Sequence, residues 1–211
     1  MQIAILIFDG LTALDAIGPY EVLSRLPGAE LRFVAKDPGP KRTDTGALGV
    51  HADVALGDLD APEVVLVPGG KGNRPLMRDP EVLEWLRSVH EGSTWTTSVC
   101  TGALVLGAAG ILDGKRATTH WAFLDRLPEL GAEPVAERVV EDGKVITAAG
   151  VSAGIDMALT LAARIGGDEV AQAIQLGIEY DPAPPFDAGS PSKAPPEAIE
   201  LIRALAHPQS E

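Results

Sequence analysis

The feature that most restricts the fold of this chain is an alternation of short apolar runs with helix-like segments. Gln2–Phe8 (QIAILIF) and Glu63–Gly70 (EVVLVPGG) are nearly continuous apolar runs of strand length, and Glu30–Lys36 (ELRFVAK) is a third expected strand between them. Unbroken apolar runs are typical of parallel strands that are buried on both faces. The alternation therefore predicts an α/β fold: a mostly parallel central sheet with helices on both faces.

Helical patterns follow these runs. One helix is expected to begin at Gly18–Pro19 and to continue through Tyr20–Leu26, and another to cover Asp79–Gly92 with Pro80 in its first turn. Further helices are expected at Thr101–Leu112, Asp156–Gly167 and Asp168–Tyr180, followed by a short terminal helix.

Two segments predict β structure of another kind. Gly46–Leu59 is expected to form a small β excursion at an edge. Arg138–Thr147 (RVVEDGKVIT) carries Asp142 and Gly143 at its centre, which is a hairpin signal.

Length and composition favour one domain over residues 1–211. The chain has 211 residues, 45% of them hydrophobic, which is enough for one sizeable core. A proline-rich segment at about residues 181–196 (DPAPPFDAGSPSKAPP) comes too late to link two domains and is expected to lie on the surface. No internal repeat interrupts this organisation.

Charge and cysteine content exclude several classes of protein. A net charge of −13 opposes nucleic-acid binding, and no apolar stretch approaches the roughly 20 residues that span a bilayer. The start, MQIAILIFDG, has no basic region before its apolar run, so we expect no signal peptide and a cytoplasmic location. The single cysteine cannot form an intramolecular disulfide.

That cysteine, Cys100, is the first candidate for chemistry. Thr94–Val99 is rich in β-branched residues and predicts a strand, while the segment from Thr101 onward predicts a helix, so Cys100 falls in the turn between them. Sites form at the carboxyl ends of parallel strands, and a helix N-terminus favours thiolate over thiol. Cys100 is therefore a candidate nucleophile; the alternative is an inert, buried cysteine.

Two other loops are expected at the same edge of the sheet. Asp15 lies just before the expected Gly-Pro helix start, and Gly69 and Gly70 follow the strand that ends at Val67. A carboxyl beside a cysteine can move protons, and unshielded amides can stabilise developing negative charge. The alternatives are an N-cap role for Asp15 and a tight turn at the glycine pair.

These motifs together carry a family resemblance. The stretches LDAIGPYEV, VLVPGG, SVCTG and ATTH resemble the ThiJ/PfpI superfamily, which implies a flavodoxin-like sandwich with a cysteine on a strand-to-helix elbow. The longer runs TSVCTGALVLGAAGILDGKRATTHWA, GIDMALTLAA and EYDPAPPFDAGSP are similar to the isonitrile hydratases within it. The resemblance implies hydration of isonitriles to N-substituted formamides.

The resemblance also implies roles for particular residues. Cys100 matches the nucleophile, Thr101 the neighbouring hydroxyl and Asp15 the acid that faces the sulfur. Gly70 and the backbone of Thr101 would supply amides near the reacting carbon, and Gly69 and His120 would bind substrate.

Two further residues have competing interpretations. His120 is either a partner for the cysteine or a hydrogen-bonded core residue. Glu21 is a competing carboxylate, although helical spacing favours a solvated or salt-bridged position for it.

The implied reaction needs a small isonitrile and water, with no cofactor and no metal. Four scattered histidines and one cysteine give no zinc set, and GGKG lacks the Ser or Thr of a phosphate-binding loop. A homodimer is implied by the resemblance and by the apolar PAPPF stretch. Two alternatives remain: a glyoxalase or deglycase acting on α-oxoaldehydes, and a non-enzymatic redox or ligand sensor.

Overall fold

The structure is a computed structural model, and it describes residues 1–59 and 61–206. The chain divides into two compact units, one over residues 1–178 and a shorter one from residue 179 onward. The shorter unit contains the proline-rich segment and helix α7 (Pro196–Ala206), which confirms the expected terminal helix. One domain over the whole chain stays a prediction.

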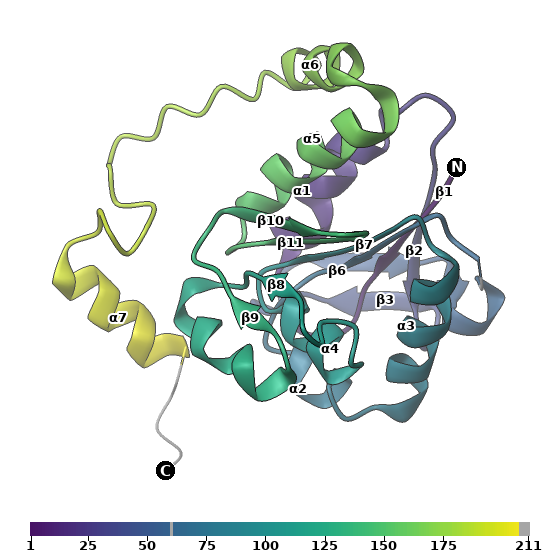
Figure 1. The fold of residues 1–211 in the computed structure, drawn as a ribbon, viewed down its shortest axis with the longest axis horizontal. Coiled ribbons are helices and arrows are strands. Elements are labelled where there is room, and N and C mark those ends of the chain that lie inside the picture. Colours follow the sequence, from purple (N-terminus) through teal and green to yellow (C-terminus); the bar gives the residue numbers. More distant parts are fainter. Residues whose placement is uncertain (60, 207–211) are drawn as a thin grey trace. The chain divides into compact units, whose positions relative to one another are not determined.

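A seven-stranded sheet forms the centre of the first unit (Figure 1), with the order β10-β11-β7-β6-β1-β2-β5. The strands are β1 (Gln2–Leu6), β2 (Glu30–Ala35), β5 (Val54–Ala55), β6 (Val64–Val67), β7 (Trp95–Val99), β10 (Val139–Asp142) and β11 (Val145–Ala148). Every neighbouring pair is parallel except β10 and β11. The predicted, mostly parallel sheet is confirmed.

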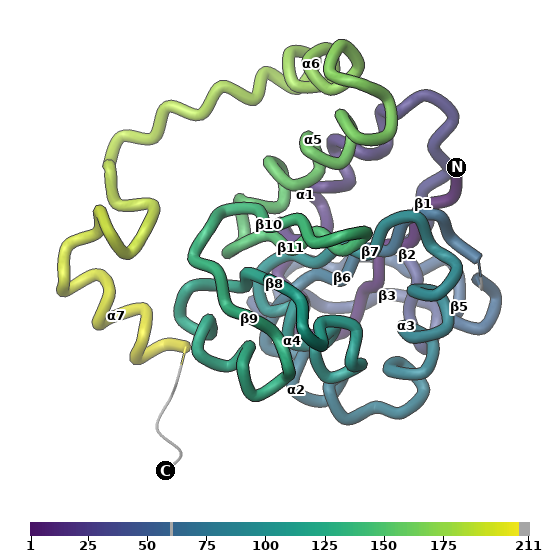
Figure 2. The backbone as a smooth tube through the Cα atoms, in the orientation of Figure 1, coloured from purple at the N-terminus to yellow at the C-terminus, as the bar shows by residue number. Residues whose placement is uncertain are grey.

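Helices cover both faces of this sheet (Figures 1 and 2). One face carries α1 (Ala13–Leu23) and α5 (Ala153–Gly166), with α6 (Asp168–Gly177) packed on α5. The other carries α3 (Pro80–Gly92) and α4 (Gly102–Ala108), with the short α2 (Asn73–Leu76) beside α4. This is the flavodoxin-like sandwich that the family resemblance implied.

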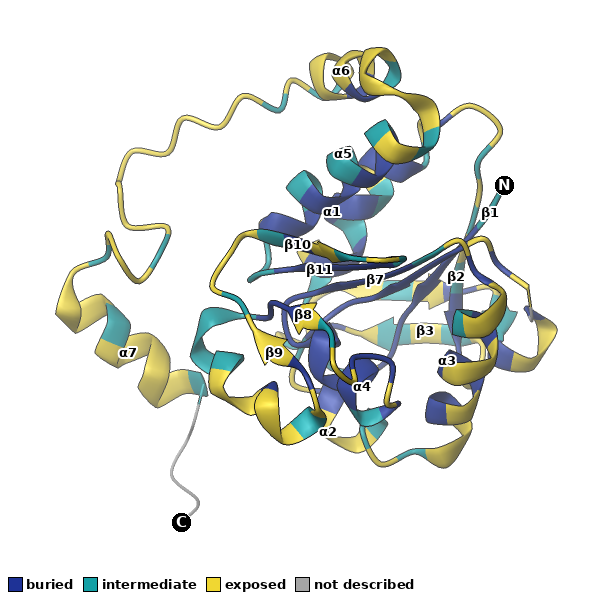
Figure 3. Cartoon of the chain, in the orientation of Figure 1, coloured by how far each residue is buried: buried dark blue, intermediate teal, exposed yellow. Residues whose placement is uncertain are grey.

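The core lies between these layers, and the sheet is its most buried part (Figure 3). All four residues of β6 are fully buried, as are Ile3 and Ile5 of β1. Continuous burial explains why these strands have no polar alternation.

The expected edge features are present. β3 (Gly39–Arg42) and β4 (Gly49–Ala52) form an antiparallel pair, and β5 extends the main sheet at its edge. The β10–β11 hairpin turns through Gly143, whose φ of 62° is in the left-handed region that glycine tolerates.

The remaining short elements lie in the connections. They are β8 (Arg116–Ala117), β9 (Glu133–Pro134) and the 3₁₀ helices η1 (Leu56–Asp58), η2 (Trp121–Arg126) and η3 (Pro128–Leu130).

Several predicted helix boundaries are wrong. Helix α1 ends at Leu23 rather than Leu26, α5 begins at Ala153 rather than Asp156, and α6 ends at Gly177 rather than Tyr180. Two further differences have a structural reason. Helix α1 begins at Ala13, so Gly18 and Pro19 lie inside it rather than at its start. Pro19 fits there although it has no N–H for a helical hydrogen bond, and Gly18 lets α5 approach, since a Cβ on Gly18 would lie 3.1 Å from Ile155 Cγ1. Helix α4 ends at Ala108 instead of Leu112, because Gly110 adopts φ 78° just beyond it.

Within residues 1–59 and 61–206, no helix is both long and apolar enough to cross a membrane.

Candidate active site

Cys100 occupies a sharp turn directly after β7. Its φ is 56°, a left-handed conformation that is uncommon for a side chain other than glycine, and its side chain is buried. Its N–H donates to the carbonyls of Ala148 and Ala149, both at 3.1 Å, and its own carbonyl accepts from Thr119 Oγ1 at 2.8 Å. These bonds to β11 and to the loop before η2 hold the strained elbow in place.

Three donors approach the Cys100 thiol: the backbone amides of Thr101 and Val151 and the Thr101 hydroxyl. They lower the thiol pKa, yet burial has the larger effect, followed by the negative charge of Asp15, and the pKa of Cys100 rises to about 12. The helix N-terminus lowers the pKa of Cys100 through the Thr101 amide, as expected from the sequence, but burial and Asp15 raise it by more. Desolvation of the charged sulfur outweighs the nearby donors.

Asp15 lies in the first turn of α1 and is completely buried. Its Oδ2 accepts the Gly69 N–H at 2.9 Å, whereas Oδ1 has no hydrogen-bond partner within the described residues. Burial raises its pKa from 3.8 to about 7, against the lowering effects of the Gly69 amide and Cys100, while Asp44 adds a smaller rise. Asp15 does not cap α1, because Thr12 occupies the N-cap position.

Gly69 and Gly70 connect the loop after β6 to the other two loops. A Cβ on Gly69 would lie 2.7 Å from Thr101 N and 2.8 Å from both Asp15 Oδ2 and Cys100 Cβ. The Gly70 N–H donates to Thr101 Oγ1 at 3.1 Å. Both amides are thus hydrogen-bonded within the protein: the Gly69 amide orients Asp15, and the Gly70 amide orients Thr101. The sequence instead led us to expect these amides to face the reacting carbon. A role in substrate binding stays a prediction for both glycines.

His120 precedes η2, and its Nδ1 accepts the Ala122 N–H at 3.3 Å. Its ring packs against Gly150, where an added Cβ would lie 2.6 Å from Cδ2, and stacks on Trp121 with 5.7 Å between the ring centroids. Burial lowers the pKa of His120, which favours the neutral ring. These contacts fit the hydrogen-bonded interpretation, and its role in substrate binding stays a prediction.

Glu21 lies on the exposed side of α1, where it pairs with Arg25 at 2.7 Å. The expected salt-bridged position is confirmed, so Asp15 is the carboxylate that reaches the cysteine.

Sequence reasoning missed two residues of this site. Asn73 is buried and its Nδ2 donates to Thr101 Oγ1 at 2.9 Å, while Val151, with φ 40°, directs its amide to Cys100. Both follow strands of the same sheet, β6 and β11, and therefore reach the same edge. That topology was the available signal, because neither residue type indicates catalysis by itself.

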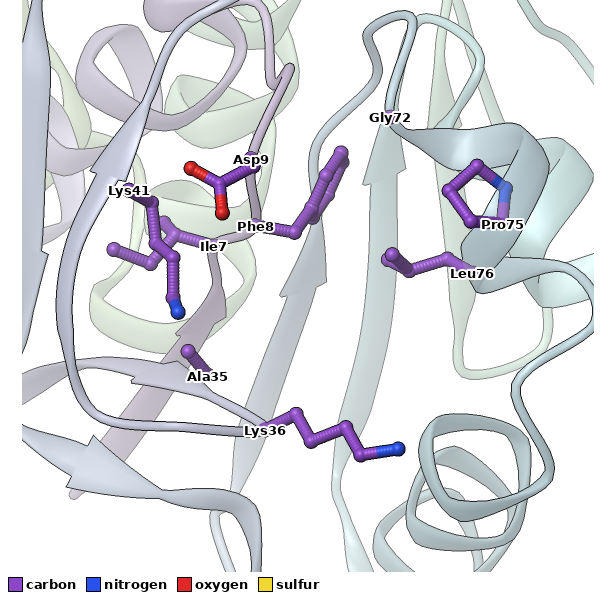
Figure 4. A pocket seen from close by; sticks show the side chains of 9 residues that line it. All are labelled: Ile7, Phe8, Asp9, Ala35, Lys36, Lys41, Gly72, Pro75 and Leu76. Atoms are coloured by element: carbon purple, nitrogen blue, oxygen red, sulfur yellow. The ribbon is translucent and has the colours of Figure 1, made fainter.

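A separate pocket of about 210 Å³ lies where β1 and β2 end (Figure 4). Apolar side chains such as Phe8 and Leu76 line it together with Lys36 and Lys41, whereas Cys100 is not among its lining residues. Lys36 is already paired with Asp79 at 2.8 Å. This pocket is distinct from the cysteine cluster.

The described residues contain no group of three or more His, Cys, Asp or Glu side chains that could hold a metal ion.

The chain is a mostly parallel α/β sandwich with a strained cysteine turn beside a buried carboxyl. These features place it among α/β proteins whose site is built around a cysteine. The sequence pattern of the DJ-1/PfpI family matches residues 1–164, and this chain belongs to that family.

Two relatives extend this result. The chain is 49% identical to a protein named isonitrile hydratase from Pseudomonas putida over 208 residues, which is 99% of this chain and 91% of that one. The crystal structure of a ThiJ/PfpI family protein from Pseudomonas syringae superposes with a TM-score of 0.95 at 38% identity, covering 98% of this chain and 86% of that one.

A third relative has a different description. A protein of Pseudomonas aeruginosa named HTH-type transcriptional regulator CdhR is 33% identical over 181 residues, which is 82% of this chain but 52% of the regulator. The relatives of this chain therefore include a protein that is named as an enzyme and one that is named as a regulator.

Proposed function

We propose that this protein hydrates isonitriles to N-substituted formamides through a covalent bond to Cys100. The geometry that carries the proposal is the buried Cys100 elbow, with a φ of 56°, beside the buried Asp15 carboxyl, whose pKa burial raises to about 7. The 49% identity to a protein named isonitrile hydratase supplies the substrate class.

The first step adds the Cys100 S–H across the terminal carbon of R–NC. The Asp15 carboxylate accepts the thiol proton as the S–C bond forms, and Asp15 then gives that proton to the same carbon. The product is a thioimidate, R–N=CH–S–Cys100. A pKa near 7 suits both halves of this transfer, because acid and base forms are then similarly populated at neutral pH.

The second step adds water to the thioimidate carbon. Asp15 accepts a proton from the water as the C–O bond forms and passes it to the imine nitrogen, which gives R–NH–CH(OH)–S–Cys100. Collapse breaks the C–S bond, transfers the hydroxyl proton to sulfur through Asp15 and releases R–NH–CHO. The two steps together consume one isonitrile and one water and regenerate the thiol.

Thr101 supports the sulfur in this scheme. Its hydroxyl and amide donate to Cys100 and stabilise negative charge as the proton leaves. Gly69 and Gly70 act by orienting Asp15 and Thr101, and His120 contributes a neutral wall for the R group.

The raised thiol pKa also bears on the alternative of a redox sensor. Oxidation by peroxide follows thiolate character and exposure, and Cys100 is buried, with a pKa that burial raises. The site therefore favours a reaction in which Asp15 removes the proton of the Cys100 thiol. A sequence with a single cysteine suits the cytoplasm, where we propose that the protein acts.

The direct test is to incubate the protein with alkyl and aryl isonitriles and, in parallel, with methylglyoxal. We expect N-formamide from the isonitriles and at most background turnover in Cys100→Ala, because loss of a covalent nucleophile removes the pathway. Formamide would be quantified by chromatography and mass spectrometry. Preferential turnover of methylglyoxal would favour the glyoxalase alternative, and undiminished activity in Cys100→Ala would exclude covalent catalysis.

A further inference from the structure

The hydroxyl of Thr101 has a hydrogen-bond arrangement that leaves it little freedom. Its oxygen accepts two bonds, from the Gly70 N–H at 3.1 Å and from Asn73 Nδ2 at 2.9 Å. A hydroxyl has two acceptor lone pairs and one hydrogen, so both lone pairs are occupied. The hydrogen must then point away from Gly70 and Asn73, and the neighbouring acceptor is the Cys100 sulfur.

Of the two donors to Thr101, the Asn73 side chain is the adjustable one. The Gly70 amide is fixed by the backbone and fills one lone pair, which still leaves the hydroxyl hydrogen two staggered positions. The Asn73 NH₂ group occupies the second lone pair and leaves one position, toward sulfur. Asn73 therefore decides whether the hydroxyl of Thr101 is aimed at Cys100.

The burial of Asn73 indicates that its hydrogen bond to Thr101 explains why an asparagine occupies this position. Asn73 is only 3% exposed, and its Oδ1 is buried without a hydrogen-bond partner within the described residues. Burying an amide with one group unsatisfied is unfavourable, and a leucine of similar size would pack there without that cost. The unsatisfied Oδ1 is tolerated because Nδ2 of the same amide donates to Thr101 Oγ1, which an apolar side chain cannot do.

We propose that Asn73 is a positioning residue that holds the Thr101 hydroxyl toward the sulfur of Cys100 and so assists loss of the thiol proton. The inference deepens the proposed function, on which its catalytic meaning rests. Asn73 touches no reacting atom in this scheme and acts only through Thr101. The other titratable groups that act on the sulfur or its partner are Asp15 and, through Asp15, Asp44.

The test measures the reactivity of Cys100 without an isonitrile. Because Cys100 is the only cysteine, the rate of carbamidomethylation by iodoacetamide at pH 8 reports its thiolate fraction. Losing one hydrogen bond to the thiolate should slow the reaction about threefold to tenfold in Asn73→Leu, and similarly in Thr101→Val. In the double variant, Asn73→Leu should add nothing to the effect of Thr101→Val, since the first residue acts through the second.

Thr97→Val is the matched control. It removes another buried hydrogen bond on β7, from Thr97 Oγ1 to the Val65 carbonyl, at a residue that does not contact Thr101 through any bond described above. We expect it to lower stability but leave the alkylation rate unchanged. If Asn73→Leu does not fold, Asn73→Asp provides the same test, because an ionised carboxylate would accept the Thr101 hydrogen and turn it away from sulfur.

Two outcomes would overturn the proposal. The first is an alkylation rate in Asn73→Leu or Asn73→Asp that equals the rate of the unmodified protein. The second is that Asn73→Leu slows alkylation equally in the unmodified protein and in the Thr101→Val background. Hydration kinetics then separate this inference from the proposed function. With the hydratase activity present, we expect Asn73→Leu to lower kcat while KM stays similar. If the protein hydrates no isonitrile, the alkylation result still decides whether the Asn73–Thr101–Cys100 arrangement operates.

Discussion

At Cys100, two physical effects oppose each other, and burial prevails. The amides of Thr101 and Val151 stabilise a thiolate, but removing the sulfur from water and placing it near Asp15 raises its pKa to about 12. A protonated sulfur is well suited to the proposed addition, because the isonitrile carbon must receive both a sulfur and a proton. The base form of Asp15 is what makes that proton transferable.

The same burial makes Asp15 a source of instability. Its folded pKa of about 7 lies above the unfolded value of 3.8, so the unfolded state releases its proton first as pH rises. The stability of the fold therefore falls between about pH 4 and pH 7, and the loss amounts to about 4 kcal/mol above that range. We expect Asp15→Asn to be more stable than the unmodified protein at pH 8 and to lose this advantage at pH 4.

Urea unfolding at both pH values measures this effect, with Glu21→Gln as the control from the exposed side of α1. In the same variants, Asp15→Asn should reduce hydration about a hundred- to ten-thousandfold, because it removes the group that moves the proton in both steps, whereas Glu21→Gln should stay active. Equal stability of Asp15→Asn and the unmodified protein at pH 8 would show that Asp15 is not held at a raised pKa.

At the scale of elements, the loop between β6 and α2 packs closely against the turn at Cys100 and the first turn of α1. A methyl group on Gly69 would lie within 2.8 Å of Thr101 N, Asp15 Oδ2 and Cys100 Cβ, closer than real Cβ contacts come. We expect Gly69→Ala to push these three residues apart and to lower kcat/KM at least about a hundredfold, since displacements of about 1 Å have effects of that size.

Gly57→Ala is the matched control for this loop variant, because an added Cβ there meets nothing within 4 Å. Steady-state hydration kinetics of both variants, beside their circular dichroism spectra, would show whether the effect is local. Near-normal activity in Gly69→Ala would mean that the loop relaxes and that its fit to Asp15 and Cys100 is not required.

The strands were predictable because continuous apolar runs such as β6 have a single interpretation in a chain with helices between them. The start of α1 was not, since Gly18–Pro19 is typical of a helix start and only the contact of Gly18 with α5 explains an interior position. Cys100 and Asp15 were found from loop position. The contact of Asn73 with Thr101 and the raised pKa of Cys100 both depend on which groups are buried together. The sequence alone does not give that information.

At the scale of the whole chain, the elements cooperate through one edge of the sheet. Residues from the loops after β1, β6, β7 and β11 meet at Cys100, although they come from positions as distant as Asp15 and Val151. Parallel strands make this convergence unavoidable, because all their carboxyl ends lie on the same side. The site therefore depends on the sheet as a unit more than on any one helix.

Exposed apolar side chains outside the site lead to the last prediction. Large hydrophobic residues lie open on α6, on the proline-rich segment and on α7, and each is more than 60% exposed: Leu176, Phe186, Leu201 and Leu205. Helix α7 has no buried residue at all, although its sequence is amphipathic. Exposed apolar side chains on an amphipathic helix are typical of a subunit interface, so we expect a homodimer in which a second copy covers the apolar side chains of α7.

Sedimentation velocity at micromolar concentration would measure the assembly. The double variant Leu201→Glu/Leu205→Glu should shift the protein toward monomer, because charged side chains on a buried apolar face are strongly unfavourable. Glu197→Gln, on the same helix, is the control and should sediment like the unmodified protein. A monomer in the unmodified protein at this concentration would contradict the prediction. A dimer that the double glutamate variant leaves intact would instead place the interface away from α7.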